Sequence, residues 1–230
     1  MTDRLKTIAN MITVGSSVAD IGADHGFLSI NLIENGISSK VIIGEVNEGP
    51  YQKSLYNVQN SKLANKIDIR KGDGLQILKP LEVETVVIAG MGGDTIVEIL
   101  NYDIEKSKSY NEFIFQPMTK ANVLRQFLAY KGWIIIDEKI IRETDVFYTI
   151  IKVKPENIPY TLNDLELQIG PLILKADTQL KKEYIELFKI KYKKVYDNLH
   201  NSNRQDRELL INEYRQKFLI LEAILNGSND

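Results

Sequence analysis

The chain has 230 residues, which is enough for one or two domains with a full hydrophobic core. It has no cysteine, which excludes disulfides and thiolate zinc sites, and with only His25 and His200 we expect no protein-bound metal. The formal net charge of −2 does not indicate nucleic-acid binding, although it would conceal a local basic face. Because we find no long apolar run and no signal peptide, we expect a cytoplasmic protein without membrane contact.

The first expected helix covers residues 2–10, where a capping residue is followed by apolar residues at helical spacing. On this spacing alone, Arg4 is a solvated surface charge. A short apolar run over residues 17–21 then turns at Gly22 and enters an amphipathic segment over residues 27–35. A strand, a glycine turn and a helix in this order present backbone N–H groups at a helix N-terminus, as α/β sheets do at ligand sites.

The glycine turn has the form Asp-x-Gly-x-x-x-Gly, not the Gly-x-Gly-x-x-Gly of dinucleotide sites, and it carries Asp20 and Asp24. These carboxylates would repel a pyrophosphate and attract a cationic sulfonium, so charge favours S-adenosylmethionine over NAD. The alternative is an ordinary helix start capped by an aspartate. His25 also has two interpretations: it shapes a pocket, or it bonds to backbone at the helix start.

The second strand is expected over residues 41–46, a nearly unbroken apolar run that ends in Glu45 and Val46. An acid at the end of the second strand, roughly 20 residues past the glycine turn, can hold two ribose hydroxyls. The alternative is an exposed carboxylate at a strand end. A helix over residues 51–60 follows, with Pro50 as its first position.

The third strand is expected over residues 67–71, and the turn after it contains Asp73 and Gly74. In a parallel sheet this turn lies at the edge where ligands gather, so Asp73 could accept a hydrogen bond from an adenine amino group. The fourth strand, residues 85–89, leads into Gly90-Met91-Gly92-Gly93. Three glycines in four positions allow close approach to the backbone, and Met91 would either pack on a planar base or fill a gap.

The remaining strands are expected over residues 113–115, 133–141 and 146–153, with helices over residues 94–100 and 120–130. Alternating strands and helices with a strand pair at the end predict an α/β, doubly wound sheet of seven strands, one of them antiparallel. The prolines of residues 154–159 indicate a linker. We therefore expect a first domain over residues 1–154 and a second over residues 155–230.

The second domain contains two apolar heptad seams, residues 185–199 and 211–225, joined by a polar break over residues 200–203. This pattern predicts an antiparallel helical hairpin, a short coiled coil. Lysines on the first helix are either a solvated face or a contact surface for a phosphate backbone. Dimerisation is the third possibility for the hairpin. The lysines that would contact phosphate are Lys181, Lys182, Lys189 and Lys193.

Taken together, these motifs resemble the bacterial tRNA (adenine-22-N1)-methyltransferase family, often called TrmK. Residues 18–26 are similar to its cofactor loop, where members typically carry D-I-G-S-D-H, and residues 44–50 are similar to its second-strand motif. Gly72-Asp73-Gly74 and residues 88–93 match the next two motifs, and Arg4-Leu5 also fits. One departure is Met118, because the family usually has Q-P-N where this chain has Gln116-Pro117-Met118.

The resemblance implies a Rossmann-like class I methyltransferase that uses S-adenosylmethionine to methylate N1 of adenine 22 in the D-arm region of tRNA. The alternative is a methyltransferase acting on another RNA, a protein or a small molecule, with the hairpin as a dimerisation arm. We expect no metal, and a monomer in preference to a homodimer. No catalytic residue is assigned; the candidates are Asp20, Asp24 and His25. The residues implied to bind the cofactor are Asp20, Gly22, His25, Glu45, Val46, Asp73, Gly74, Ala89, Gly90 and Met91. Those implied to bind the substrate are Arg4, Gly92, Gly93, Gln116 and Pro117, with the four hairpin lysines.

Overall fold

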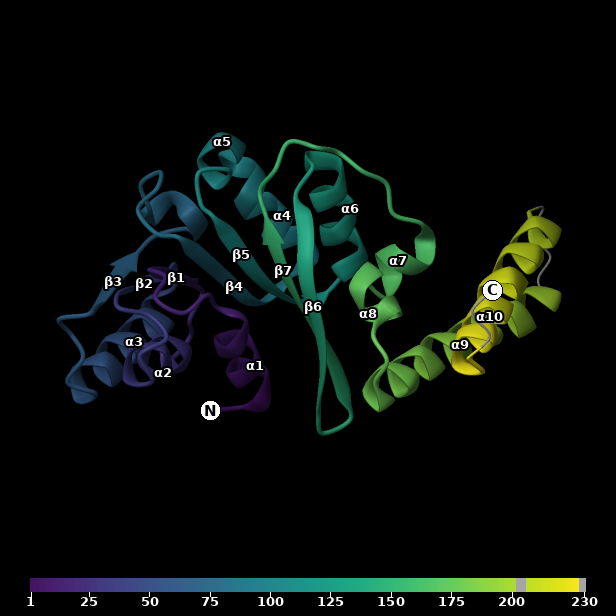
Figure 1. Ribbon diagram of the computed structural model, residues 1–230, viewed down its shortest axis with the longest axis horizontal. Helices are drawn as coiled ribbons and strands as arrows, with labels where there is room; N and C mark the ends of the chain where they lie inside the picture. Colours follow the sequence, from purple (N-terminus) through teal and green to yellow (C-terminus); the bar gives the residue numbers. More distant parts are fainter. Residues whose placement is uncertain (202–205, 228–230) are drawn as a thin grey trace. The chain divides into compact units, whose positions relative to one another are not determined.

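The computed structural model describes residues 1–201 and 206–227 (Figure 1). The chain forms two compact units that divide between Leu172 and Ile173. The first unit therefore extends beyond residue 154, where the sequence predicts a boundary. The reason is a set of buried hydrogen bonds that joins the segment after the predicted linker to the first unit.

The first unit is built on a sheet with the order β3-β2-β1-β4-β5-β7-β6, seven strands within the described residues. Strands β1 to β5 are parallel, and β7 runs antiparallel to both β5 and β6. This confirms the predicted doubly wound sheet and its antiparallel strand. The strands are β1 Val18–Ile21, β2 Val41–Glu45, β3 Ile67–Lys71, β4 Thr85–Gly92, β5 Glu112–Thr119, β6 Ile134–Glu143 and β7 Val146–Lys154.

Helices cover both faces of the sheet, as Figure 1 shows. One buried apolar cluster joins α1, α2 and α3 to one face, and a second joins α4 and α6 to the other. The buried residues of these helices recur at helical spacing, and this spacing turns one face of each helix toward the sheet. They are α1 Asp3–Met11, α2 Phe27–Glu34, α3 Glu48–Asn60, α4 Gly93–Tyr102 and α6 Ala121–Lys131, with the shorter η1 Gly74–Ile77, α5 Ile104–Ser107, α7 Asp164–Gln168 and α8 Pro171–Lys175.

Two strands are longer than the sequence predicts. β4 continues through its glycines to Gly92, and β5 continues to Thr119, because the two strands stay paired with register shifts on either side of Met91. Irregular pairing of this kind re-aims side chains at a sheet edge. Helix α3 begins at Glu48, two residues before Pro50.

A buried ion pair joins α6, β6 and the segment that follows the predicted linker. The Nε of Arg125 donates to Glu138 at 2.8 Å, and both side chains are fully buried. The Nη1 of Arg125 also donates to the Leu167 carbonyl at 2.9 Å, and its Nη2 donates to the Ile169 carbonyl at 3.2 Å. The Leu172 N–H donates to Glu138 at 2.9 Å. These hydrogen bonds hold residues 167–172 against α6 and β6, so this segment belongs to the first unit.

The second unit contains α9 Gln179–His200 and α10 Arg207–Leu225, which pack against each other as an antiparallel hairpin. Tyr192 contacts Tyr214 edge to face, and Lys189 lies 3.7 Å from Glu222. The predicted heptad seam supplies the buried residues Ile185, Leu199 and Leu221 as well as Tyr192. Of the predicted polar break, Ser202 and Asn203 lie outside the described residues.

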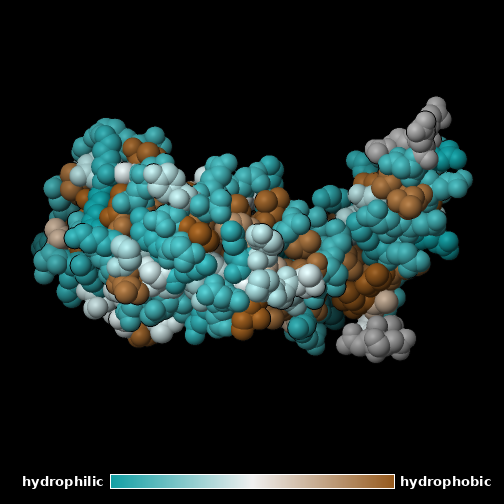
Figure 2. Space-filling view, turned by 90° about the horizontal axis from the view of Figure 1, so that it is seen from above, coloured by the Kyte–Doolittle hydropathy of each residue, from teal (hydrophilic) through white to brown (hydrophobic). Residues whose placement is uncertain are grey.

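The hairpin surface mixes charged and apolar side chains. Leu187 and Ile190 are about half exposed on α9, and Lys191 and Lys194 follow them along the same helix. Figure 2 accordingly shows separate apolar groups among hydrophilic residues on this unit. The described surface is therefore not a continuous apolar face.

Candidate active site

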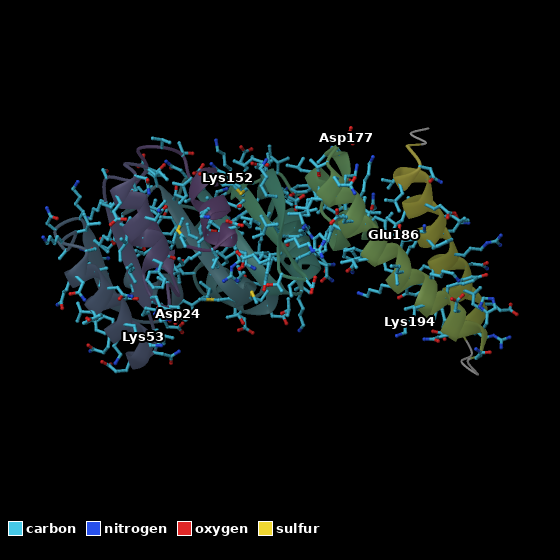
Figure 3. All side chains as sticks on the ribbon, turned by 90° about the horizontal axis from the view of Figure 1, so that it is seen from below. Asp24, Lys53, Lys152, Asp177, Glu186 and Lys194 are labelled. Atoms are coloured by element: carbon cyan, nitrogen blue, oxygen red, sulfur yellow. The ribbon has the colours of Figure 1, made fainter. Side chains whose placement is uncertain are left out.

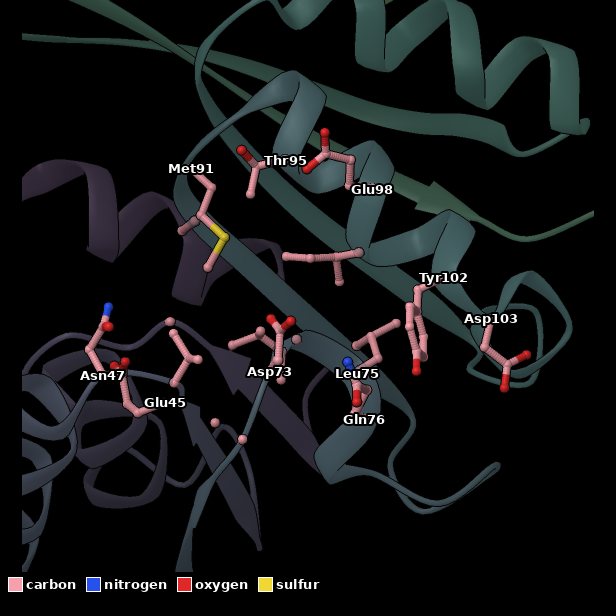
Figure 4. A pocket seen from close by; sticks show the side chains of 18 of the residues that line it. Glu45, Asn47, Asp73, Leu75, Gln76, Met91, Thr95, Glu98, Tyr102 and Asp103 are labelled. Atoms are coloured by element: carbon pink, nitrogen blue, oxygen red, sulfur yellow. The ribbon is translucent and has the colours of Figure 1, made fainter.

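A cavity of about 450 Å³ lies at the carboxyl ends of the first four strands (Figure 4). Its walls come from the ends of β1, β2 and β3 with the turns after them, from the irregular last part of β4 and from α4, on both sides of the point where the strand order reverses. Ligands of doubly wound sheets bind at this switch point. Eight residues expected to bind a cofactor line the cavity: Gly22, Glu45, Val46, Asp73, Gly74, Ala89, Gly90 and Met91.

The turn after β1 approaches the last part of β4 closely. Gly22 has φ +73°, and a Cβ added to it would lie 2.3 Å from the Cε of Met91. The left-handed backbone favours glycine here, and a larger residue would also displace the methionine side chain that faces it. Asp24 has φ +57°, its side chain is 67% exposed, and its carboxylate lies 3.4 Å from Nε2 of His25.

The structure places Asp20 beneath the cavity rather than in its wall. It is 3% exposed, and its carboxylate accepts a hydrogen bond from the Ser29 hydroxyl at 2.7 Å. His25 does not line the cavity either; its ring stacks on Phe27 with centroids 5.3 Å apart. Asp20 thus connects β1 to α2, because a strand directs alternate side chains to opposite faces and this one meets the helix.

Burial raises the pKa of Asp20 from 3.8 to about 6, with the negative charge of Glu45 adding to the shift and the Ser29 hydrogen bond opposing it. Between about pH 4 and pH 6 the folded protein therefore binds more protons at this site than the unfolded chain does. The contribution of Asp20 to the free energy of unfolding is therefore present in full below about pH 4 and is lost as the pH rises through about 6.

We expect Asp20→Asn to remove this dependence, because the amide oxygen can still accept from Ser29 but carries no charge. Relative to the wild type, the free energy of unfolding of the variant should rise by up to about 3 kcal/mol between pH 4 and pH 7. Urea denaturation of both proteins at several pH values measures the difference. A difference that stays constant with pH would show that Asp20 is not buried as a charged group.

Acidic side chains from the ends of β2 and β3 form the polar part of the cavity. Glu45 is 5% exposed, burial raises its pKa, and its carboxylate accepts a hydrogen bond from the Asp24 N–H. Asp73 precedes η1 and is exposed, and its carboxylate lies between Glu45 and Leu75 in Figure 4. The two carboxylates could therefore accept hydrogen bonds from different parts of one elongated ligand.

An apolar slot lies next to these acids, and Gly74 and Ile99 form one of its walls. A Cβ added to Gly74, which has φ +49°, would lie 3.0 Å from the Ile99 side chain of α4, so the two residues are in contact. Gly90 has φ +80°, and a Cβ there would meet no atom within 4 Å, so its backbone faces open space in the cavity wall. A flat apolar ring fits such a slot better than a phosphate does, because the lining acids would repel the phosphate.

Gly92 and Gly93, predicted to bind substrate, lie outside the cavity wall. A Cβ added to Gly93 would lie 2.3 Å from the Lys120 carbonyl oxygen, and one added to Gly92 would lie 3.3 Å from the Thr119 hydroxyl. Gly93 is therefore required where α4 begins against the end of β5. Gly93 thus packs on backbone and Gly92 on a side-chain hydroxyl, in addition to any contact they make with substrate.

The structure also buries Gln116 and Pro117, which the resemblance implies as substrate residues, because β5 continues through them. Met118, the next residue, is 45% exposed. Arg4 lies beside them: its Nη1 is 3.1 Å from Oε1 of Gln116 and 3.3 Å from Sδ of Met118. Arg4 is therefore not a free surface charge.

Several cavity residues carry no motif in the sequence. The face of α4 contributes Thr95, Glu98, Ile99 and Tyr102 (Figure 4). Asn47 lies in the second-strand motif but is not among the residues expected to bind a ligand. The helical spacing of Thr95, Glu98, Ile99 and Tyr102 is a signal that could have found them. It required knowing which face of α4 turns toward the cavity, and that depends on packing.

The described residues contain no group of three or more His, Asp or Glu side chains placed to hold a metal ion. Within the same residues, none of the helices combines the length and the apolar composition that a membrane crossing requires.

The comparisons with known proteins agree with this geometry. Residues 1–151 match the model of a methyltransferase domain family. The tRNA (adenine(22)-N(1))-methyltransferase of Bacillus subtilis strain 168 is 32% identical over 173 residues, which cover 75% of this chain and 73% of that protein. The chain belongs to the tRNA (adenine(22)-N(1))-methyltransferase family.

Solved structures of this family match the chain over nearly its whole length. The B. subtilis m1A22 tRNA methyltransferase TrmK is 26% identical with a TM-score of 0.85, covering 98% of each chain. A Streptococcus pneumoniae protein solved in complex with S-adenosyl-L-methionine is 30% identical with a TM-score of 0.81, covering 98% of this chain and 99% of that one. The S-adenosylmethionine named there is a sulfonium joined to a ribose and an adenine. A cavity with Glu45 and Asp73 at its strand ends and an apolar slot beside them fits those groups.

Proposed function

We propose that the protein transfers a methyl group from S-adenosylmethionine to N1 of adenine 22 in the D-arm region of tRNA. The observation that carries the proposal is the cavity at the switch point of the sheet, where Glu45 and Asp73 stand at neighbouring strand ends beside an apolar slot. This arrangement occurs in a chain 32% identical to an enzyme named for that reaction.

In this proposal Glu45 accepts hydrogen bonds from the ribose hydroxyls and Asp73 accepts one from the adenine amino group. Gly74 and Ile99, which contact each other, form one apolar wall against which the adenine packs, and the segment from Ala89 to Met91 borders the methionine part. When bound, the cofactor supplies an electrophilic methyl group. The acids that surround it favour a cation over a phosphate ligand.

The chain has no need of a strong general base, because neutral adenine carries a lone pair on N1. The protein must instead take the base out of its stack, align N1 and exclude water. Met118 is an exposed residue near the end of β5, between Pro117 and Thr119, which pair with Met91 and Gly92 of β4. We assign it the apolar contact with the target base; Asp24, exposed on the β1 turn, remains the candidate that offsets the positive charge of the methylated ring.

The hairpin lysines are proposed to contact the tRNA backbone. They differ in whether their ammonium groups already bind an acceptor within the protein. The Nζ of Lys189 lies 3.5 Å from Glu186, that of Lys193 lies 2.9 Å from Asp197, and that of Lys181 donates to the Ala176 carbonyl at 2.6 Å. Lys182 and Lys194 are exposed, and Figure 3 labels Lys194 on α9. We therefore place the strongest phosphate contacts at Lys182 and Lys194.

The function is tested with an unmodified bacterial tRNA transcript that carries A22 and with the same transcript carrying G22. After incubation with protein and S-adenosylmethionine, we expect 1-methyladenosine by nucleoside mass spectrometry in the A22 transcript only. Reverse transcription should then stop at position 22. Equal methylation of both transcripts, or none of either, would contradict the proposal.

A further inference from the structure

We infer that Arg4 is a positioning residue that acts through Gln116 on the Gly90 turn of the cavity, and is not a contact of tRNA. The inference goes beyond the proposed function because it concerns a residue outside the cavity wall. The inference rests on the proposed function only where the KM for tRNA is measured.

Arg4 is held in place from several sides. Its backbone N–H donates to Glu143 at 2.7 Å, which ties the first turn of α1 to β6. Its guanidinium carbon lies 5.1 Å from the centre of the Tyr148 ring, and its Nη1 donates to Gln116. The Nε is buried and has no hydrogen-bond partner within the described part of the chain. An unpaired buried donor is unfavourable, so the other contacts of Arg4 must hold it there.

Gln116 passes this constraint to the cavity. Its side chain is fully buried, and its Oε1 accepts from Arg4 and also from the Gly90 N–H at 3.2 Å. Its Nε2 donates to the Pro117 carbonyl at 3.1 Å. Both groups that face Oε1 are donors, and a guanidinium has no acceptor. Reversing the amide would set its NH₂ against two donors, so Arg4 fixes the orientation of Gln116.

Gly90 is the point in the cavity wall that depends on this orientation. The pairing of β4 with β5 shifts register between Ala89 and Met91, which leaves Gly90 out of the regular ladder. With φ +80°, Gly90 turns the backbone between two residues that line the cavity. Without Arg4, only the Gly90 N–H and the adjacent Pro117 carbonyl would orient Gln116, and the turn that borders the cofactor would be less well defined.

Calorimetric binding of S-adenosylhomocysteine to four proteins tests the inference: wild type, Arg4→Met, Gln116→Leu and the double variant. We expect Arg4→Met to raise the Kd about tenfold, as for the loss of one hydrogen bond to a charged group, and Gln116→Leu at least as much. The double variant should bind like Gln116→Leu within about twofold, because Arg4 acts through that residue. Lys6→Met, an exposed cation on the same helix, is the matched control.

Additive effects in the double variant would overturn the inference. So would an Arg4→Met protein with unchanged Kd, a raised KM for tRNA and a flatter salt dependence, because that pattern belongs to a phosphate contact. If Arg4→Met does not fold, Arg4→Lys takes its place, since it keeps a cation with fewer donors and should raise the Kd less. The calorimetry needs no tRNA, so a failure to methylate tRNA would overturn the proposed function alone.

Discussion

Replacing Glu45 with alanine is expected to weaken the binding of S-adenosylhomocysteine about 100-fold, close to 3 kcal/mol. The carboxylate is almost fully buried in the cavity wall, and we propose that it accepts from both ribose hydroxyls. Charge-assisted hydrogen bonds in such a position are among the strongest polar contacts that a protein makes. Isothermal titration calorimetry measures the change directly.

Glu48→Ala is the matched control for this prediction. Glu48 lies three residues further along the chain, its carboxylate is exposed, and it pairs with Lys71 at the protein surface. Its loss should leave the Kd unchanged within about twofold. Glu45→Gln keeps an acceptor for the Asp24 N–H and should therefore lose less than Glu45→Ala. If Glu45→Ala binds as tightly as the wild type, the ribose does not lie at the end of β2.

Replacing Arg125 with methionine is expected to destabilise the first unit by about 3–5 kcal/mol, measured by urea denaturation. The variant would leave the Glu138 carboxylate buried without its partner. It would also remove the donor to the carbonyls of Leu167 and Ile169. A buried charge without a partner is far less stable than the pair it came from, whereas the pair itself adds little.

The double variant Arg125→Met, Glu138→Leu separates the cost of leaving Glu138 unpaired from the small net contribution of the intact ion pair. Because it removes both charges, we expect it to recover part of the loss, although the Leu172 N–H also loses its acceptor. Lys108→Met breaks an exposed pair with Glu105 and should change the free energy of unfolding by less than about 1 kcal/mol. A loss below about 1 kcal/mol in Arg125→Met would mean that water reaches this pair.

The sequence predicts the cavity acids well because they follow buried strands. Glu45 ends an apolar run of the type that marks a buried parallel strand, and Asp73 lies in the Gly-Asp-Gly turn after the next short strand; parallel strands end at one edge of a sheet. Their place in the chain is therefore enough to bring them together. The structure adds the degree of burial, which raises the pKa of Glu45 and which the sequence does not contain.

Side-chain direction is what the sequence does not determine. Asp20 belongs to the same motif as Gly22, yet its carboxylate meets Ser29 under α2 instead of the cavity. Gln116 follows an apolar run as Glu45 does, but β5 continues past it and its side chain is buried. In both cases the outcome depends on which neighbour covers that face of the strand, and that neighbour is distant in sequence.

The boundary between the units has the same explanation. Prolines after residue 154 correctly predict an irregular segment, and the structure has neither helix nor strand between Lys154 and Asp164. The segment that follows nevertheless belongs to the first unit, because the carbonyls of residues 167–169 accept hydrogen bonds from Arg125, more than forty positions earlier. Local composition carries no trace of such a contact.

A crystal structure of the protein with S-adenosylhomocysteine tests the central claim most directly. The account predicts an adenine packed against the wall that Gly74 and Ile99 form, ribose hydroxyls within hydrogen-bond distance of Glu45, and the amino-acid part beside the turn that contains Gly90. A ligand seated elsewhere on the protein, or a ribose turned away from Glu45, would contradict it.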